Sequence, residues 1–459
     1  MSEPILHADV AIVGSGPAGM AAARDLCAFG LSVVVLDENH GAGGQIFRQP
    51  RTVDLDEAHR PGDSPSHARG QDLLRGFLRS GARLETGAVV WDAAPGRVWF
   101  EQRGESRLVR CRDLVLATGA HERAIPFPGW TLPGVVTLGA AQIMTRGFDL
   151  RPGSRALVAG SGPLLLPTIA ALAAKNVEVV AALEACRFSA AVRALPGILW
   201  NAARRREARY YLGALRRARK RLSWGSAVFA AKGEGRVERA VIGRVDRRGR
   251  PLRETAREIE VDLVCAGFGL VPAFELGKRI GCALAHDEGL GGFHIATDET
   301  TLTSVPHVHA AGEAAGIGGS EVAIAEGRLA AAAILHRAKG VPIPRALVRD
   351  RIRERGAARA LLSAFALPRG LYELAEPDTI VCRCEDVTLA EVREAGALFG
   401  GTLRGIKMGC RAGMGACQGR ICGMSLQELV ESGRGRDEPS VQMPVKPVAT
   451  DVILNAPAG

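Results

Sequence analysis

The chain has 459 residues, of which 47% are hydrophobic and 24% charged, and its formal net charge is +10. This length exceeds one ordinary core and predicts two or three domains, while the composition predicts an ordered globular protein rather than a disordered one. The N-terminus lacks a secretory signal and we find no uncharged apolar stretch of spanning length, so we expect a cytoplasmic protein without a membrane span. Peripheral attachment to a membrane through partners is left open.

The first motif, "ADVAIVGSGPAGMAAARDLCAFGLSVVVLDE", is a strand, a glycine loop, an alanine-rich helix and a second apolar strand. Gly14 permits the sharp turn, Gly16 lets the backbone approach a pyrophosphate, and Gly19 lets helix and strand pack closely. Asp37 ends the second strand, where an acid accepts a hydrogen bond from a ribose hydroxyl. The unit predicts a dinucleotide site, because the alternative of a simple glycine-rich turn leaves Asp37 unexplained.

The segments "DLVLATGAHERAIPFPGW" and "TSVPHVHAAGEAAGIGGSEVAIAEGRLAAAAI" follow later in the chain. They resemble the second and third flavin signatures of the two-dinucleotide-domain flavoproteins, which include glutathione and thioredoxin reductases. The family usually has aspartate where this chain has Glu313, one methylene longer. The resemblance implies FAD as the cofactor. The residues expected at FAD are Gly14, Ser15, Gly16, Pro17, Ala18, Gly19, Asp37, Glu38, Gly44, Gln45, Ala117, Thr118, Gly119, Gly312, Glu313 and Ala323.

A second glycine loop, "GSGPLL", carries Gly160 and Gly162, and Glu184 ends the strand that follows its helix. The family usually binds NAD(P)H here and has a third glycine or alanine, but this chain has Leu165. A leucine side chain obstructs the close contact of helix and strand that the third glycine permits. We therefore expect no productive NAD(P)H binding. A retained fold that is empty, or that holds another nucleotide such as ATP or ADP, is left open.

Disulfide reductases of this family pass electrons from the flavin to a nearby cysteine pair. The segment "GAGGQIFRQPR", where one subgroup carries that pair, contains no cysteine. Cys186 and Cys265 are too far apart for the C-x-x-C of the other subgroup. Electrons must therefore leave by another route. A lone His121 beside a flavin segment is more often structural than a base, so no catalytic residue is assigned.

Four cysteines near the end of the chain are spaced as C-x-C and C-x4-C. Four thiolates suit a metal centre, and zinc would be satisfied by the same number, although zinc ribbons use C-x-x-C knuckles. The segments "VCRCEDVTLAEVREA" and "RAGMGACQGRICG" resemble the 2Fe-2S domain of bacterioferritin-associated ferredoxin. In the resembling sequences the ligands match Cys382, Cys384, Cys417 and Cys422, while Cys410 occupies a position that need not be cysteine.

The order of these motifs covers most of the chain. It resembles the alpha (A) subunit of amino- and imino-acid dehydrogenases, which include opine oxidase, D-hydroxyproline dehydrogenase and the corresponding subunit of hydrogen cyanide synthase. The resemblance implies an electron-transfer subunit working with a D-amino-acid-oxidase-like FAD subunit and, in some complexes, a small ferredoxin-like 2Fe-2S subunit. Two alternatives stay open, a self-sufficient NAD(P)H-dependent FAD and 2Fe-2S oxidoreductase and a non-catalytic nucleotide-binding scaffold. The substrate, among hydroxyproline, proline, glycine and opines, is not indicated by these residues.

Two basic runs, 203–225 and 345–360, carry much of the positive charge. A basic helix can neutralise phosphates, but it is more often a solvated face or a docking surface. We find no aromatic-interleaved motif beside the two runs, so we expect no nucleic-acid partner.

The expected fold is α/β, a glutathione-reductase-like flavoprotein with two dinucleotide-binding domains and a small C-terminal 2Fe-2S domain. The FAD-binding domain would be interrupted by the second nucleotide-binding domain and followed by a helical connector, the 2Fe-2S domain and an extended tail. The expected boundaries are 1–148 and 286–340 for the FAD-binding domain, 149–285 for the inserted domain, 341–375 for the connector, 376–435 for the 2Fe-2S domain and 436–459 for the tail.

Overall fold

The computed structural model describes residues 5–48, 64–199, 202–217, 221–430 and 438–458. The chain divides into two compact units, and each unit is made of separate stretches of sequence. Unit 1 contains Met1–His121, Val271–Ala360 and Ser440–Gly459, and unit 2 contains Glu122–Leu270 and Leu361–Pro439. The division into six segments expected from the sequence stays a prediction.

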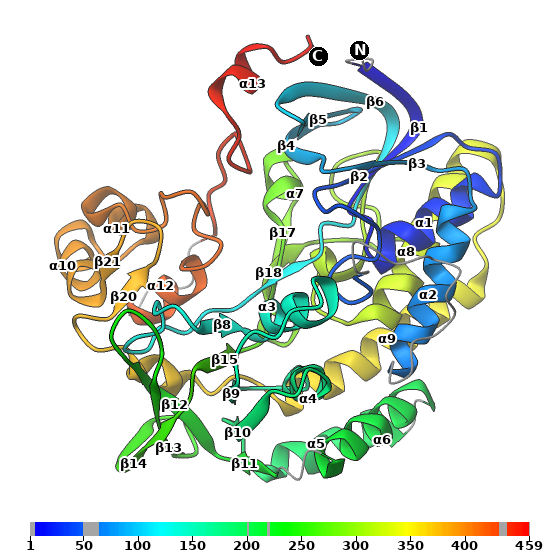
Figure 1. Cartoon of the computed structure of the whole chain (residues 1–459). Helices are drawn as coiled ribbons and strands as arrows, with labels where there is room; N and C mark the ends of the chain where they lie inside the picture. The colour runs from blue at the N-terminus through cyan, green and yellow to red at the C-terminus, as the bar shows by residue number, and fades with distance from the viewer. Residues whose placement is uncertain (1–4, 49–63, 200–201, 218–220, 431–437, 459) are drawn as a thin grey trace. The chain divides into compact units, whose positions relative to one another are not determined.

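Unit 1 is built on a seven-stranded sheet, in which six strands have the order β3-β2-β1-β6-β5-β4 (Figure 1). The seventh strand, β19, pairs with β6. The neighbours β3, β2, β1, β6 and β19 are parallel, whereas β4, β5 and the first half of β6 form an antiparallel ribbon. The strands are β1 Ile5–Val13, β2 Val33–Asp37, β3 Arg83–Thr86, β4 Val89–Ala94, β5 Arg97–Gln102, β6 Glu105–Leu116 and β19 Val308–Ala310.

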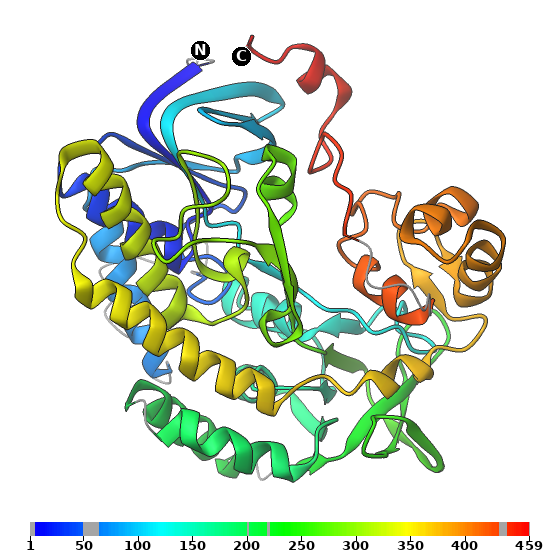
Figure 2. The same cartoon turned by 180° about the vertical axis from the view of Figure 1, so that it is seen from behind.

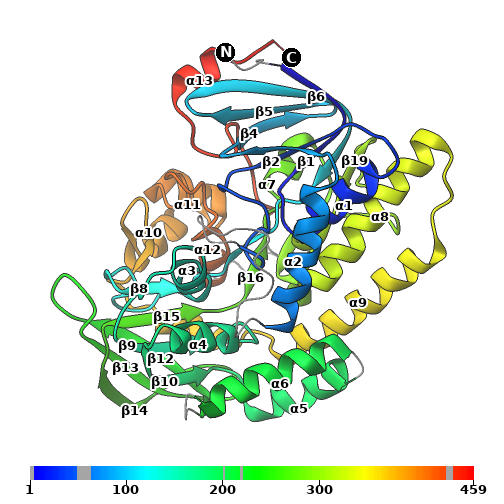
Figure 3. The ribbon, with the colours of Figure 1, turned by 45° about the vertical axis from the view of Figure 1, so that its right-hand side comes forward.

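The side chains of β1 alternate between two buried cores, as the two-residue period of a strand requires. Val10 and Ile12 belong to the core under the helices, and Ala11 and Val13 belong to the core on the opposite face. The sheet is therefore buried on both faces, as parallel sheets are. Figure 3 shows the helices that cover the first face, which are α1 Pro17–Cys27, α2 Pro65–Leu78 and α8 Ser320–Lys339.

The remaining elements of unit 1 come from the segment after the inserted domain, Val271–Ala360, and from the C-terminal tail, Ser440–Gly459. The tail packs on the sheet, where the Val445 amide donates to the Trp91 carbonyl at 2.8 Å and Val445 is buried. Figure 2 shows the long helix α9, drawn in yellow, after α8. These elements are α7 Glu275–Ile280, β17 Leu284–Asp287, η2 Glu288–Leu290, β18 Gly292–Ile295, η3 Gly312–Ala315, α9 Arg345–Ala364 and α13 Thr450–Leu454.

Unit 2 contains a five-stranded parallel sheet with the order β11-β10-β9-β15-β8 and an antiparallel sheet of three strands. The strands are β8 Val135–Thr137, β9 Arg155–Gly160, β10 Glu178–Glu184, β11 Leu222–Trp224, β12 Ser226–Lys232, β13 Arg239–Val245, β14 Pro251–Glu260 and β15 Leu263–Gly267. The helices are α3 Leu138–Gln142, η1 Ile143–Gly147, α4 Leu165–Ala174, α5 Phe188–Leu199 and α6 Ala202–Arg217. Two short strands contain unit boundaries, β7 Ala120–Glu122 and β16 Leu270–Pro272.

A small helical subdomain completes unit 2 around its own core of buried apolar residues, including Leu389, Val392 and Ile406. Its helix α10 begins at a capping box, in which the Thr388 and Glu391 side chains each accept from the other's backbone amide. Its elements are β20 Ile380–Cys382, β21 Val387–Thr388, α10 Leu389–Phe399, α11 Leu403–Cys410 and α12 Gly423–Leu429. The preceding η4, Arg369–Leu374, instead buries Leu371 and Leu374 in the core of the unit 2 sheets. Throughout the described part of the chain, no helix has the length and apolarity needed to span a membrane.

Candidate functional site

The first glycine loop connects β1 to α1 and has the shape that its glycines predict. Gly14 has a positive φ of 103°, and a Cβ atom there would lie 2.2 Å from the Ala117 carbonyl oxygen. A Cβ atom at Gly19 would lie 1.9 Å from the Gly14 carbonyl oxygen. At Gly16 the nearest atom to such a Cβ is the Gly44 Cα, at 3.9 Å. Gly14 and Gly19 are thus required by packing, whereas a Cβ at Gly16 would make only an ordinary contact with Gly44.

Helix α1 begins directly at this loop, with Gly16 as its N-cap and Pro17 at its first position. Proline is suited to this position because the first amides of a helix have no intrahelical partner. Ser15 and Ala18 are buried on either side. The free amides and the helix dipole make this terminus favourable for an anion such as a pyrophosphate.

Asp37, at the end of β2, ties the glycine loop to the sheet. Its Oδ2 accepts from the Ser15 amide at 2.7 Å and from the Ser15 hydroxyl at 2.6 Å. Its Oδ1 accepts from the Asn39 amide and from the Asn39 side-chain nitrogen, both at 2.8 Å. Because a carboxylate offers about four acceptor positions, a ribose hydroxyl would have to replace one of these donors.

Arg48 is a residue of this region that the sequence patterns did not indicate. Its Nη2 donates to Asn39 Oδ1 at 2.9 Å and to Gln45 Oε1 at 3.0 Å. Its Nε is buried without a hydrogen-bond partner among the described residues. Burial lowers the pKa of the guanidinium, although the nearby Asp37 and Glu38 oppose this. An unsatisfied buried donor beside the glycine loop fits an anionic ligand. In the sequence, Arg48 is marked only as a cation three residues after Gln45, which does not by itself indicate a ligand contact.

Two other predicted FAD residues, Gly44 and Glu38, contact other parts of unit 1, the first glycine loop and the C-terminal tail respectively. Gly44 has a positive φ of 61° and packs against Gly16, because a Cβ at Gly44 would lie 2.8 Å from the Gly16 Cα. Glu38 forms an ion pair with Lys446 of the tail. The Glu38 carboxylate therefore has a protein partner in this structure.

The second predicted segment follows β6. The Ala117 amide donates to the Val13 carbonyl at 2.9 Å, which brings the segment against the first loop. The Thr118 hydroxyl donates to the Ala273 carbonyl at 2.6 Å, and the Ala273 amide donates to the Gly119 carbonyl at 2.9 Å. Gly119 has a positive φ of 77°. These hydrogen bonds hold residues 117–119 in one backbone conformation, as a segment that lines a bound cofactor requires.

The third predicted segment, at η3 and the start of α8, also packs on the first loop. A Cβ at Gly312 would lie 3.1 Å from Ala18 Cβ and 3.2 Å from Ala323 Cβ. The Glu313 carboxylate accepts from the Gly318 amide at 3.0 Å and from the Gly319 amide at 2.7 Å, and burial raises its pKa. The three predicted flavin segments are thus brought together within unit 1.

The second glycine loop differs from the first at its third glycine position. Leu165 is fully buried, and α4 begins only there, whereas α1 begins right after the second glycine of its loop. Glu184 accepts from the Gly162 amide at 2.9 Å and from the Cys186 amide at 2.8 Å. Burial raises the pKa of Glu184 to about 7. This acid therefore stabilises the loop as Asp37 stabilises the first one.

The segment after α9 lies across this second loop. The Ser161 hydroxyl donates to the Phe365 carbonyl at 3.4 Å, and the Cys186 thiol donates to the Ala366 carbonyl at 3.6 Å. The Phe365 ring stacks on Trp224 with 6.4 Å between centroids and 29° between planes. These contacts are at the carboxyl ends of β9, β10 and β11, the edge where a doubly wound sheet binds a nucleotide. The chain's own backbone thus lies where a second nucleotide would bind.

The four predicted cysteine ligands lie together in the small subdomain of unit 2. The Sγ atoms of Cys384 and Cys417 are 3.4 Å apart, and the Gly413 amide donates to Cys382 Sγ at 3.4 Å. Hydrogen bonds from Cys422 lower the pKa of the Cys382 thiol to about 6 and that of the Cys417 thiol to about 4. The same bonds raise the pKa of Cys422. Burial raises the pKa of the Cys384 thiol to about 11. The four sulfurs therefore form one group in which Cys382 and Cys417 ionise most readily, and four cysteine ligands are what a 2Fe-2S cluster needs.

Two nearby residues, Gly415 and Cys410, help to define which cysteines belong to this group. A Cβ at Gly415 would lie 3.0 Å from Cys384 Sγ, so glycine is needed for this approach. Cys410 at the end of α11 instead donates to the Ile406 carbonyl at 3.3 Å, and burial raises its pKa. Among the residues that the structure describes, the four cysteines included, no three or more His, Cys, Asp or Glu side chains are already arranged to hold a metal ion, and this finding does not separate zinc from an iron-sulfur cluster.

The fold and these two sites define a flavoprotein with two dinucleotide-binding folds and a cysteine-rich iron-sulfur domain. Residues 8–333 match the pyridine nucleotide-disulphide oxidoreductase family, and residues 380–432 match the BFD-like [2Fe-2S] binding domain. The chain belongs to this oxidoreductase family, in the group that includes the A subunit of opine oxidase and the HcnB subunit of hydrogen cyanide synthase.

The chain is 35% identical over 436 residues to the opine oxidase A subunit of Rhizobium meliloti (strain 1021), covering 92% of each chain. It is 33% identical over 462 residues to HcnB of Pseudomonas aeruginosa, covering 97% of this chain and 98% of the relative. The structure resembles L-proline dehydrogenase from P. horikoshii with a TM-score of 0.72, 20% identity and coverage of 98% and 81%, a likeness that concerns the fold alone. The predicted fold class, the oxidoreductase class and the cofactors FAD and 2Fe-2S are confirmed.

Proposed function

We propose that this chain is the electron-transfer subunit of a heteromeric dehydrogenase that oxidises an amino or imino acid. The observation that carries the proposal is the similarity over nearly the whole chain to proteins named as subunits of opine oxidase and hydrogen cyanide synthase. The substrate class is then an opine, proline, D-hydroxyproline or glycine-like compound. Its oxidation would take place on a D-amino-acid-oxidase-like FAD subunit, with a small ferredoxin-like 2Fe-2S subunit as a further partner.

In this proposal FAD binds unit 1 at the three segments gathered around the first glycine loop. The α1 amides and Arg48 would hold the pyrophosphate, a ribose hydroxyl would replace one of the four donors to Asp37, and the segments at Thr118 and Glu313 would contact the remainder. When bound, a flavin takes up two electrons together and releases them singly to a one-electron centre. The residues of this chain supply binding and orientation for that exchange.

The proposed cluster ligands are Cys382, Cys384, Cys417 and Cys422, and Cys410 is not a ligand. Support comes from the sulfur contacts among the four and from the bond of Cys410 to its own helix. Cys410→Ser should leave the visible and electron paramagnetic resonance spectra of the cluster unchanged, whereas Cys384→Ser, the matched control, should lose at least 80% of the cluster. Loss of the cluster in Cys410→Ser would contradict the ligand assignment.

A self-sufficient NAD(P)H-dependent reductase is the main competing function. Leu165 and the backbone of Phe365 and Ala366 at the second loop argue against it. Anaerobic mixing of the purified chain with NADH or NADPH should leave the flavin oxidised over minutes. Bleaching within seconds by either nucleotide would refute the subunit proposal.

The positive test uses the complex purified through a tag on this chain. Each candidate amino or imino acid is added anaerobically, and flavin absorbance and reduction of an artificial dye are followed. One substrate should reduce the dye with the complex, and the isolated chain should fail with every substrate. A complex in which no substrate reduces the flavin would favour the non-catalytic scaffold.

A further inference from the structure

We propose that Arg351 and Arg355 of α9 are positioning residues of the flavin site. The two arginines and Glu326 form a unit, here called the arginine clasp, that holds the third flavin segment in the shape that receives FAD. The inference rests on the proposed binding of FAD in unit 1. It assigns a role to a basic helix that lies beyond residues 8–333 and before residues 380–432, outside both matched family regions.

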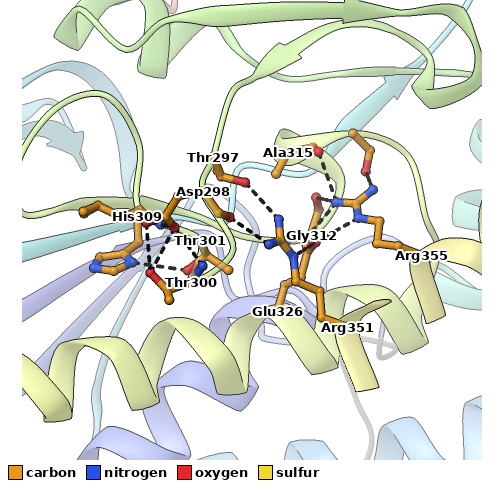
Figure 4. A network of polar contacts seen from close by, with 12 residues as sticks. Thr297, Asp298, Thr300, Thr301, His309, Gly312, Ala315, Glu326, Arg351 and Arg355 are labelled. Carbon is orange, nitrogen blue, oxygen red and sulfur yellow. Dashed lines mark hydrogen bonds and ion pairs between the residues drawn. The ribbon is translucent and has the colours of Figure 1, made fainter. Parts of the chain in front are cut away.

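Glu326 on α8 is the centre of the clasp (Figure 4). Its side chain is fully buried, and its Oε2 accepts from the Gly312 amide at 2.9 Å. Gly312 has a positive φ of 75° and packs directly against Ala18 of the first glycine loop. The Glu326 carboxylate therefore fixes the Gly312 backbone at the point where the third flavin segment packs on the first glycine loop.

A buried carboxylate is costly unless cations and hydrogen bonds compensate it. Arg355 Nε donates to Glu326 Oε1 at 2.8 Å and Arg355 Nη2 to Oε2 at 2.9 Å, while Arg351 Nε donates to Oε1 at 3.1 Å. Arg351 and Arg355 are four residues apart, so they lie on one face of α9. Their side chains are each only 17% exposed. This face of the basic run is therefore an internal contact of unit 1.

Arg355 also holds the backbone of the third segment directly. Its guanidinium donates to the carbonyls of Gly316 at 2.5 Å, Ala315 at 3.1 Å and Gly312 at 3.3 Å. Arg351 donates to the Asp298 carbonyl at 2.8 Å, so the clasp also holds the turn at Asp298. The planar fork of arginine can serve a carboxylate and several carbonyls at once, which lysine cannot. The segment that carries Glu313 is thus held by α9 from one side.

The test compares Arg355→Met and Arg355→Lys with Arg353→Met. Arg353 is the matched control, because it lies on the same helix, is 68% exposed and pairs with Asp350 and Glu354. Apoprotein of each variant is titrated with FAD by fluorescence, and the flavin and cluster absorption spectra of the reloaded protein are recorded. We expect the dissociation constant for FAD to rise at least 30-fold in Arg355→Met and at least threefold in Arg355→Lys. Arg353→Met should change it less than twofold, and the cluster spectrum should be the same in all three.

The outcomes separate the clasp from the proposed function. If Arg355→Met does not fold, Arg351→Met and Arg355→Lys take its place, with an expected loss of affinity of at least threefold. Wild-type affinity for FAD together with a wild-type flavin spectrum in the folded Arg355 variants would overturn the clasp. A wild-type chain that takes up no FAD would instead overturn the proposed function. Loss of the cluster along with FAD would indicate general unfolding and would also overturn the positioning role.

Discussion

The chain contains two glycine loops of nearly the same sequence, "GSGPAG" at 14–19 and "GSGPLL" at 160–165. Both come after a parallel strand, and in both an acid at the end of the next strand accepts a loop amide, at 2.7 Å from Asp37 and 2.9 Å from Glu184. The two loops differ after their second glycine. In the first loop α1 starts right after the second glycine, whereas in the second α4 starts only at Leu165 and the backbone of residues 365–366 lies at the carboxyl ends of the strands.

The comparison teaches that a shared loop motif does not define a shared ligand site. The acid and the first two glycines preserve the local fold in both loops, because they satisfy backbone groups of the loop itself. Ligand binding needs two further conditions, a helix terminus that lies close to the strand and an accessible edge of the sheet. The two loops differ in where the helix begins, right after the second glycine in the first loop and only at Leu165 in the second, and in the segment 365–366 that lies at the second loop.

The largest expected effect is in the first loop. Gly19→Ala places a Cβ 1.9 Å from the Gly14 carbonyl oxygen, so the helix must move away from the strand. We expect the FAD content of the purified variant to fall at least tenfold, measured by flavin absorbance after denaturation. The 2Fe-2S spectrum is the internal control, and a variant with full FAD content would break the comparison.

Leu165→Ala tests the same position in the second loop, where the side chain contributes to packing. Leu165 is fully buried, and truncating a buried leucine to alanine costs about 2–5 kcal/mol. We expect a loss of this size in the free energy of unfolding from denaturant titration, with FAD content unchanged. A stability within 0.5 kcal/mol of wild type, roughly the size of a surface substitution, would show that leucine has no packing role there.

The pH dependence of stability should report the acid of the second loop. The pKa of Glu184 is about 7 in the folded chain against 4.5 for an ordinary glutamate. Folding therefore favours the protonated form of Glu184. The contribution of Glu184 to the free energy of unfolding is fully present below pH 4.5 and is lost as the pH rises through 7. Relative to Glu184→Gln, the wild type should lose at most roughly 3 kcal/mol between pH 4.5 and 8. A constant difference over this range would contradict the raised pKa.

The smallest expected effect concerns the segment that covers the second loop. Phe365→Ala removes the stacking on Trp224, an aromatic contact worth about 0.5–1.5 kcal/mol beyond its buried area. We expect a small loss of stability and no gain of NADH or NADPH oxidation, because Leu165 still occupies the position of the third glycine. Flavin bleaching by a nucleotide in this variant, measured anaerobically, would show that the covering segment alone closes the site.

Much of the candidate site was predictable from local patterns. The roles of Gly14 and Gly19 follow from spacing, and the structure gives both glycines the close backbone contacts that the motif implies. The four cysteines were grouped by spacing and resemblance, and their sulfurs meet in the structure. Arg48 and Arg355 were not found, because a single arginine carries no periodic or spacing signal.

The sequence by itself determined which residues could serve a flavin, a second nucleotide loop and a sulfur cluster, because turns and ligand spacing are local properties of the chain. Only the tertiary structure decided that Asp37 is saturated by Ser15 and Asn39 and that residues 365–366 lie across the second loop. It also decided that α9 reaches back to Glu326. The physical reason is that these contacts join residues far apart in sequence, whose hydrogen bonds and ion pairs exist only once the chain has folded.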